Sequence, residues 1–179
     1  SRIQKVAVLT QYNSRSLNEH LSSSKWWDFG RKQGGLFVFT PYTSKEGSTW
    51  FRGTADSIYQ NMTFLKRSNE EYVVITSGDS IYKMDYKKVI KEHAAKGADI
   101  TVVYQNMAGK DLTKFGVMEM DADGKLVGFE EKPEQPKSDA ASLGIYVISR
   151  TLLINLLEQA IPEGKYDLVK DIIIRFIPT

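Results

Sequence analysis

Short apolar runs and amphipathic segments follow one another along almost the whole chain. Continuous runs rich in β-branched and aromatic residues are typical of buried strands, whereas apolar residues three or four positions apart are typical of helices. This pattern predicts strands at 6–9, 36–39, 72–75, 99–104, 116–120, 126–130 and 143–148. It predicts helices at 14–21, 54–66, 86–96, 151–159 and 166–175.

The order of these elements predicts an α/β fold. In residues 1–106 strands and helices alternate, which favours a Rossmann-like, mainly parallel sheet flanked by helices. In residues 107–179 two short strands flank the polar turn 121–124, which contains glycine and indicates an antiparallel hairpin. We therefore predict one domain, with a nucleotide-binding half at 1–106 and an antiparallel ligand-side insertion in 107–179.

The composition is typical of a globular protein. Apolar residues make up 41% and charged residues 26%, and the net charge is +2. These values disfavour a disordered chain and a protein that binds nucleic acid through its charge. The absence of cysteine excludes disulfides, cysteine zinc sites and thiol catalysis, and it fits a cytoplasmic protein. No apolar run approaches the roughly 20 residues that a membrane helix needs.

Both ends of the chain lie close to apolar segments. The strand at 6–9 begins after only a few residues, and the apolar run 172–177 ends just before the C-terminus. Because domain termini usually carry some disordered residues, we expect this chain to be the central part of a domain, truncated at both ends.

Gly78 and Asp79 follow the predicted central strand at 72–75. Ligands of open α/β sheets bind at the carboxyl ends of strands, where glycine permits close approach of the backbone. An aspartate there is suited to Mg²⁺, which takes one or two carboxylates and fills its other positions with phosphate and water. The alternative is that Asp79 only caps or turns the chain.

Residues 50–56 join a loop to the start of a predicted helix. A helix start presents free backbone N–H groups, and Gly53 would let a base or phosphate approach. The alternative is ordinary capping of the helix by Thr54.

A charged cluster follows the predicted strand 126–130. Glu131 is suited to sugar hydroxyls and Lys132 to a phosphate, although a solvated strand end is the alternative. Ser142 and Gly144 open the next strand and are candidates for the same pocket. His20 and His93 lie alone in helical patterns without a second metal ligand, so both are predicted to be surface residues.

Six motifs occur in one order along the chain, at 9–21 (LTQYNSRSLNEHL), 50–56 (WFRGTAD), 77–86 (SGDSIYKMDY), 115–118 (FGVM), 129–133 (FEEKP) and 141–146 (ASLGIY). Each is weak alone. In this order they resemble the nucleotidyltransferase domain of the glucose-1-phosphate adenylyltransferase (ADP-glucose pyrophosphorylase) family along almost the whole chain.

The resemblance implies an activity, in which ATP and α-glucose 1-phosphate give ADP-glucose and pyrophosphate with Mg²⁺. It also implies a tetramer of identical or different subunits. On matching positions it assigns Asp79 to the metal and to catalysis, and Lys132 to the sugar phosphate and to catalysis. It assigns the nucleotide to Gly53, Thr54 and Gly78, and glucose 1-phosphate to Phe51, Gly116, Glu131, Lys132 and Ser142. The half at 107–179 is then the sugar-phosphate side.

The chain departs from the family pattern in several places. Phe51 stands where many relatives have tyrosine, and Ser80 stands where a histidine is usual. The family's glycine-rich triphosphate loop and its second metal aspartate do not occur in residues 1–179, so we expect these residues alone to be inactive. Two alternatives therefore stay open, namely a non-catalytic regulatory subunit and a transferase for another sugar phosphate or nucleotide.

Overall fold

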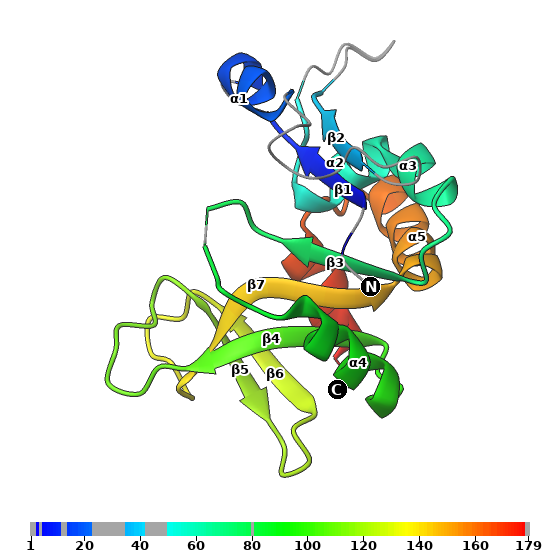
Figure 1. The fold of residues 1–179 in the computed structure, drawn as a ribbon. Coiled ribbons are helices and arrows are strands. Elements are labelled where there is room, and N and C mark those ends of the chain that lie inside the picture. The colour runs from blue at the N-terminus through cyan, green and yellow to red at the C-terminus, as the bar shows by residue number, and fades with distance from the viewer. Residues whose placement is uncertain are drawn as a thin grey trace.

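The fold combines two sheets with helices on their faces (Figure 1). The computed structural model describes residues 3, 5–11, 14–22, 35–41, 50–79 and 81–177. Within them the strands are β1 (Lys5–Leu9), β2 (Gly35–Phe39), β3 (Tyr72–Thr76), β4 (Ile100–Asn106), β5 (Gly116–Met120), β6 (Leu126–Glu131) and β7 (Ala140–Ser149). The α-helices are α1 (Ser14–Leu21), α2 (Thr54–Gln60), α3 (Met62–Lys66), α4 (Tyr86–Lys96) and α5 (Arg150–Ala160). Three shorter helices follow, the 3₁₀ helix η2 (Ile161–Glu163), the π-helix η3 (Val169–Ile173) and the 3₁₀ helix η4 (Ile174–Phe176).

The mixed α/β fold class is confirmed, and the predicted strands are present within three residues of their expected limits. The share of parallel pairing is smaller than expected. Among the described strands only β1 and β2 pair in parallel, and the pairs within the five-stranded sheet are antiparallel. The reason is β7, which runs antiparallel to both β3 and β4 and pairs with each of them.

The long strand β7 is the centre of the larger sheet. It pairs with β3, β4 and β5, so that a loop from each of these strands reaches the same edge. Its pairing with β4 is irregular, because Val103 lies opposite Ile145 and the next residue, Tyr104, lies opposite Ser142. Gly144 lies in the resulting bulge with φ 66°, a backbone conformation that glycine adopts without strain.

Helix boundaries follow from local capping. Gly97 ends α4 in the left-handed conformation, as the sequence predicts. The helix predicted at 54–66 is interrupted at Asn61, whose side-chain amide donates to the Ser57 carbonyl at 2.9 Å. Such a side-chain bond competes with the backbone ladder, and the chain restarts as α3.

The last predicted helix, at 166–175, begins later and is not a regular α-helix. The Asp167 carboxylate accepts from the N–H groups of Val169 and Lys170 at 2.9 and 2.8 Å. This capping leaves Tyr166 and Asp167 outside the helical segment, which continues as η3 and η4. Tyr166 is therefore available to contact α2.

The surface role predicted for His93 is wrong, whereas His20 is exposed as expected. His93 lies on the buried face of α4 with 2% of its surface exposed. Its Nδ1 lies 2.8 Å from the Thr101 hydroxyl, and its ring packs edge-on against Tyr72. Burial lowers the pKa of His93, although the charge of Asp99 acts in the opposite direction. The polar partner on β4 explains how a histidine is buried there.

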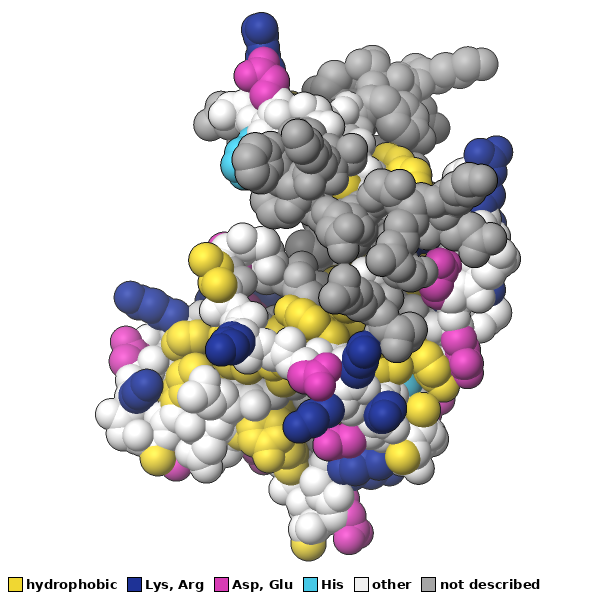
Figure 2. All heavy atoms as spheres, in the orientation of Figure 1, with side chains coloured by type: hydrophobic (Ala, Val, Ile, Leu, Met, Phe, Trp, Pro, Cys, Tyr) yellow, Lys and Arg dark blue, Asp and Glu magenta, His cyan; other side chains and the backbone are white. Residues whose placement is uncertain are grey.

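Charged side chains of both signs are interspersed on the face shown in Figure 2, where the described Lys and Arg residues lie among Asp and Glu. Apolar side chains lie between them over the lower part of this view. No helix in the described part of the chain is both long enough and apolar enough to cross a bilayer.

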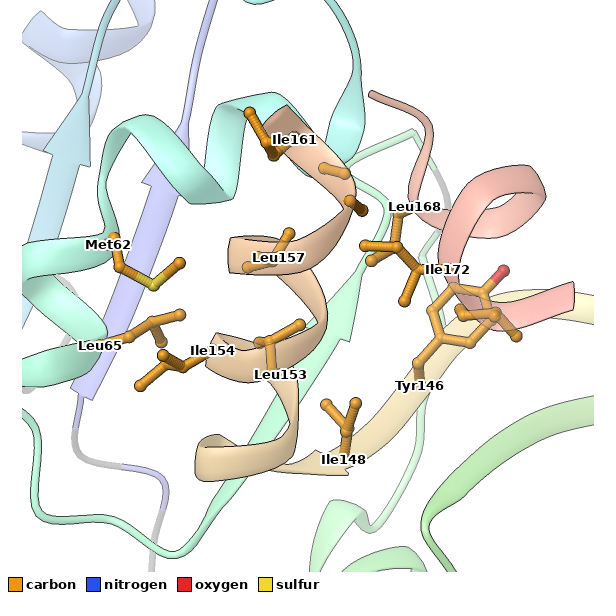
Figure 3. Close-up of a cluster of buried hydrophobic side chains, with 13 residues drawn as sticks. Met62, Leu65, Tyr146, Ile148, Leu153, Ile154, Leu157, Ile161, Leu168 and Ile172 are labelled. Carbon is orange, nitrogen blue, oxygen red and sulfur yellow. The ribbon is translucent and has the colours of Figure 1, made fainter. Parts of the chain in front are cut away.

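The main core lies between α5 and the sheet (Figure 3). Leu153 and Leu157 of α5 are fully buried and pack with Tyr146 and Ile148 of β7. Met62 and Leu65 join from α3, and Leu168 and Ile172 join from the C-terminal segment. This core ties the C-terminal segment to β7 and so determines the geometry of the site described next.

Candidate functional site

Asp79 lies in the loop that follows β3. The Ser77 hydroxyl donates a hydrogen bond to the Asp79 carboxylate, and the Ser77 N–H donates to the Gly144 carbonyl of β7 at 3.3 Å. A Cβ added to Gly78 would meet no atom within 4 Å. The loop is therefore attached to β7 through Ser77, while Gly78 faces open space.

The start of β7 carries Ser142 next to that attachment. Ser142 is buried, and its hydroxyl accepts from the Gly144 N–H at 3.3 Å. Because Gly144 also holds Ser77, the short segment from Ser142 to Gly144 connects a predicted sugar-phosphate residue to the loop of the predicted metal ligand.

Gly116 and Glu131 lie opposite each other at the paired ends of β5 and β6. A Cβ on Gly116 would lie 2.4 Å from the Phe129 ring and 3.1 Å from Glu131 Oε2. The glycine is thus required by the close approach of Phe129, and the Glu131 carboxylate extends over it. Since β5 pairs with β7 through Val117 and Ala141, this end lies beside Ser142.

Lys132 follows β6 in a strained backbone conformation. Its φ is 50°, the left-handed region, and its N–H donates to the Phe115 carbonyl at 3.0 Å. A residue other than glycine pays about 1–2 kcal/mol for this conformation. Its side chain is 64% exposed, with Nζ 3.9 Å from Glu131 Oε1. Strain of this kind is concentrated at functional sites, so it supports a functional interpretation of Lys132.

The loop before α2 has its backbone groups occupied by other parts of the chain. The Phe51 N–H donates to Gln11 Oε1 at 2.7 Å. The Tyr166 carbonyl accepts from the N–H groups of Ala55 and Asp56 at 2.8 and 3.4 Å, and a Cβ on Gly53 would lie 2.4 Å from this oxygen. The expectation that these N–H groups are free for a ligand is therefore wrong, because the chain itself approaches Gly53.

Thr54 is also engaged by the C-terminal segment. Its hydroxyl accepts from the Leu168 N–H at 2.9 Å, which links the start of α2 to the residue before η3. Gly53 and Thr54 thus each have a structural role at the contact between α2 and the C-terminal segment.

Arg52 and Asp56 form an ion pair at the same junction. The Arg52 guanidinium lies 3.1 Å from Asp56 Oδ1, donates to the Tyr166 hydroxyl at 2.7 Å and stacks on the Tyr166 ring at 4.0 Å. Asp56 is fully buried, and Oδ2 also accepts from the Arg52 N–H and from Gln60, each at 2.8 Å. Burial alone would raise the pKa of Asp56, but the hydrogen bonds from Arg52 and Gln60 outweigh it and hold the pKa below its ordinary value.

Tyr146 lies between the C-terminal segment and the sugar-phosphate candidates. Burial raises the pKa of its phenol, a hydrogen bond with Ser142 lowers it, and the charges of Glu131 and Asp167 raise it further. In Figure 3 the ring of Tyr146 lies beside Ile172 of η3. One buried phenol is thus close to residues from β6, β7 and the C-terminal segment.

The structure brings the predicted site residues together in two groups. Asp79 and Gly78 share one sheet edge with Gly116, Glu131, Lys132 and Ser142. Phe51, Gly53 and Thr54 lie at the junction with the segment 166–168. The site also contains residues that the sequence did not predict, namely Gln11, Arg52, Tyr146 and Tyr166. Among these four, only Arg52 could have been predicted from a local sequence pattern, its i, i+4 spacing to Asp56. Ser80, which departs from the family pattern, lies outside the described residues.

Comparison with known proteins decides the family. A family model described as nucleotidyl transferase matches residues 1–177. The chain belongs to the nucleotidyl transferase family. It is 43% identical to a glucose-1-phosphate adenylyltransferase of Clostridium perfringens (strain SM101 / Type A) over 175 residues, 97% of this chain and 45% of that protein. It is 41% identical to the protein of that name from Thermosipho africanus (strain TCF52B) over 181 residues, 100% of this chain and 44% of that protein.

The family resemblance expected from the six motifs is therefore confirmed. This nucleotidyl transferase chain spans less than half the length of the curated relatives it matches. The individual roles of the site residues stay predictions.

The Asp79 carboxylate is the feature of the candidate site that suits Mg²⁺. The described residues contain no group of three or more His, Cys, Asp or Glu side chains arranged to hold a metal ion. Asp79 provides one carboxylate there, which accepts a hydrogen bond from the Ser77 hydroxyl. Mg²⁺ commonly accepts such a minimal protein site when substrate phosphates and water supply its other ligands.

Proposed function

We propose that the natural gene product containing residues 1–179 transfers the adenylyl group of ATP to α-D-glucose 1-phosphate. The products are ADP-glucose and pyrophosphate. The name shared by the relatives at 41–43% identity supports the choice of both substrates. The structural observation that carries the proposal is the attachment of Ser77 to Gly144, which brings the Asp79 loop to the strand that contains Ser142.

In the proposed reaction a phosphate oxygen of glucose 1-phosphate attacks the α-phosphorus of ATP. The bond from that phosphorus to the oxygen bridging to the β-phosphate breaks, and pyrophosphate leaves with the electron pair. Mg²⁺, when bound, would neutralise charge on the phosphates. The contribution of the chain is to hold the two substrates in line, which by itself lowers a barrier by several kcal/mol.

On the sugar-phosphate side, Lys132 would bind the phosphate and Glu131 would accept hydrogen bonds from sugar hydroxyls. The exposed ammonium of Lys132 lies close to Glu131. Lys132 directly follows β6 and has a strained backbone conformation. Gly116 lets the Phe129 ring and the Glu131 carboxylate approach the backbone of β5, and Ser142 lies on the neighbouring strand.

On the nucleotide side, Asp79 would hold Mg²⁺, and Gly78 would allow the triphosphate to approach its backbone. The open space around Gly78 supports this assignment. Phe51, Gly53 and Thr54 would lie near the base and ribose, where the bond from Phe51 to Gln11 keeps the loop beside the end of β1.

The remaining features of the proposal concern the whole protein. We place it in the cytoplasm, which the cysteine-free composition supports. We also propose that it assembles into tetramers, which is supported by the family resemblance alone. Light scattering on the gene product would test this assembly.

The proposal is tested with purified gene product by pyrophosphate release. We expect turnover with ATP and glucose 1-phosphate, and we expect Asp79→Asn to lower kcat by about 100-fold or more, because the charge that holds Mg²⁺ is lost. Asp123→Asn, an exposed carboxylate in the β5–β6 turn, is the matched control and should leave kcat unchanged.

Other outcomes decide between the alternatives. Faster turnover with UTP or dTTP than with ATP would identify a transferase for another nucleotide. Absence of turnover with every nucleotide, combined with stable association with an active relative, would identify a regulatory subunit and overturn the proposal.

A further inference from the structure

The junction between α2 and the C-terminal segment contains more polar contacts than capping requires. Residues 52–56 contact residues 166–168 through two backbone bonds to the Tyr166 carbonyl, through the bond from Leu168 to Thr54 and through Arg52 on the Tyr166 side chain. We call this set of residues, 51–56 with 166–168, the closed junction.

Arg52 contacts Tyr166 in two ways at once. The guanidinium donates to the phenol oxygen at 2.7 Å and also lies 4.0 Å from the ring centroid, while its other side faces the buried Asp56. A planar guanidinium can make such contacts together, whereas a lysine ammonium cannot. Arg52 thus fixes the position of Tyr166 relative to the loop that begins with Phe51.

The segment that contains Tyr166 also packs toward the sugar-phosphate side of the site. Tyr146 and Leu168 belong to one buried cluster against which Tyr166 packs. The Tyr146 phenol also interacts with Ser142 by a hydrogen bond. Asp167 is held in place by accepting from Val169 and Lys170, so its carboxylate is not free to turn away. Packing around Tyr146 therefore connects Arg52 and Tyr166 with Ser142, a residue predicted to bind glucose 1-phosphate.

We propose that the segment 166–168 couples the nucleotide side of the site to the sugar-phosphate side, and that Arg52 is the positioning residue that holds this segment. This inference rests on the proposed function and deepens it. Arg52 touches neither reacting group in this proposal. It acts through Tyr166, so its loss should change the affinity for both substrates rather than the chemistry.

The test compares steady-state constants of the gene product, each normalised to the folded fraction. We expect Arg52→Met to raise KM roughly tenfold for ATP and also for glucose 1-phosphate, with kcat changed by less than about threefold, because binding geometry rather than transition-state charge is lost. The KM values of Arg52→Lys should fall between those of Arg52→Met and the unmodified protein. Lysine keeps a positive charge beside Asp56 but lacks the planar guanidinium that contacts Tyr166 and Asp56 together.

Two further variants distinguish the proposed role of Arg52 from a defect in folding. Tyr166→Phe keeps the ring and the backbone carbonyl and removes only the hydroxyl, so we expect an increase of roughly threefold in both KM values. Lys66→Met breaks an exposed ion pair between α3 and α5, with Nζ 2.6 Å from Glu158, and should leave both KM values unchanged.

Unchanged KM values in Arg52→Met and Tyr166→Phe, with only a smaller folded fraction, would overturn the inference and leave Arg52 a structural residue. An increase in KM for ATP alone, with KM for glucose 1-phosphate unchanged, would overturn the coupling to the sugar-phosphate side. In both cases an active unmodified protein leaves the proposed function intact. An unmodified protein that neither turns over nor binds ATP and glucose 1-phosphate in calorimetry would overturn both proposals.

Discussion

Gly53 and Gly78 lie in two motifs that the family resemblance assigns to the nucleotide, yet their surroundings are opposite. A side chain on Gly53 would collide with the Tyr166 carbonyl, whereas one on Gly78 would meet nothing within 4 Å. The closed junction therefore uses its glycine for the approach of the chain itself. Gly78, Asp79, Glu131 and Lys132, which we call the open rim, leave space and exposed charge for a ligand.

This difference shows why a glycine in a motif does not by itself identify a ligand contact. Both glycines lie where a loop meets a regular element, and both permit close approach. Only the position of a segment more than a hundred residues away in sequence distinguishes them, because Tyr166 lies against Gly53 and no described residue lies against Gly78.

The largest expected effect comes from a methyl group on Gly53. Gly53→Ala would place Cβ 2.4 Å from the Tyr166 oxygen, and two backbone segments would have to separate. We expect a loss of about 3 kcal/mol in the free energy of unfolding, from overpacking together with weakened bonds from Ala55 and Asp56. Chemical denaturation followed by circular dichroism measures the loss.

Gly78→Ala is the matched control in the open rim. It should change the free energy of unfolding by less than about 0.5 kcal/mol, because the added methyl group meets open space. It should nevertheless raise KM for ATP if the triphosphate approaches this backbone. Equal destabilisation by the two substitutions would contradict the comparison between the closed junction and the open rim.

The next effect concerns the charge inside the closed junction. Asp56→Asn keeps the shape but places an amide donor against the donors of Arg52 and Gln60, so we expect a loss of about 2 kcal/mol at neutral pH. Because hydrogen bonds hold the folded pKa of Asp56 below its ordinary value of 3.8, its contribution is present above that value and is lost as pH falls through the folded pKa.

The unmodified protein should therefore lose stability below about pH 4, while Asp56→Asn should show a weaker dependence over the same range. Asp111→Asn is the control. The Asp111 carboxylate also has a lowered pKa, through bonds from Thr113, but it is exposed. A loss in Asp111→Asn as large as that in Asp56→Asn would show that burial at the junction is not the cause.

Local features of the fold were predictable because their causes are local. The apolar runs of β1, β3 and β5 and the glycine that ends α4 are visible in the sequence. The insertion of β7 between β3 and β4 is not, since it depends on pairing with strands that are distant along the chain. His93 was misplaced for a similar reason, because its partner Thr101 lies on another element.

The two parts of the site differ in the same way. Glu131 and Lys132 end a strand that its own hairpin defines, and Asp79 follows a strand with a strong apolar pattern. Their positions at strand ends were therefore accessible to prediction, whereas the edge that they share depends on the pairing of β7 with β3 and β5. The occupied N–H groups of Ala55 and Asp56 were not, since a carbonyl more than a hundred residues away accepts from them.

The smallest effect on stability is expected at Lys132, where the comparison is sharpest. Lys132→Gly removes the strain of φ 50° but adds backbone entropy to the unfolded chain, so the free energy of unfolding should rise by about 0.5 kcal/mol at most. Calorimetric affinity for glucose 1-phosphate should fall roughly tenfold, because the cation is lost.

Lys132→Ala is the matched control, since it loses the cation but keeps the strain. It should show the same loss of affinity without the gain in stability. A clear loss of stability in Lys132→Gly, with affinity retained, would mean that Lys132 serves the fold as Gly53 does.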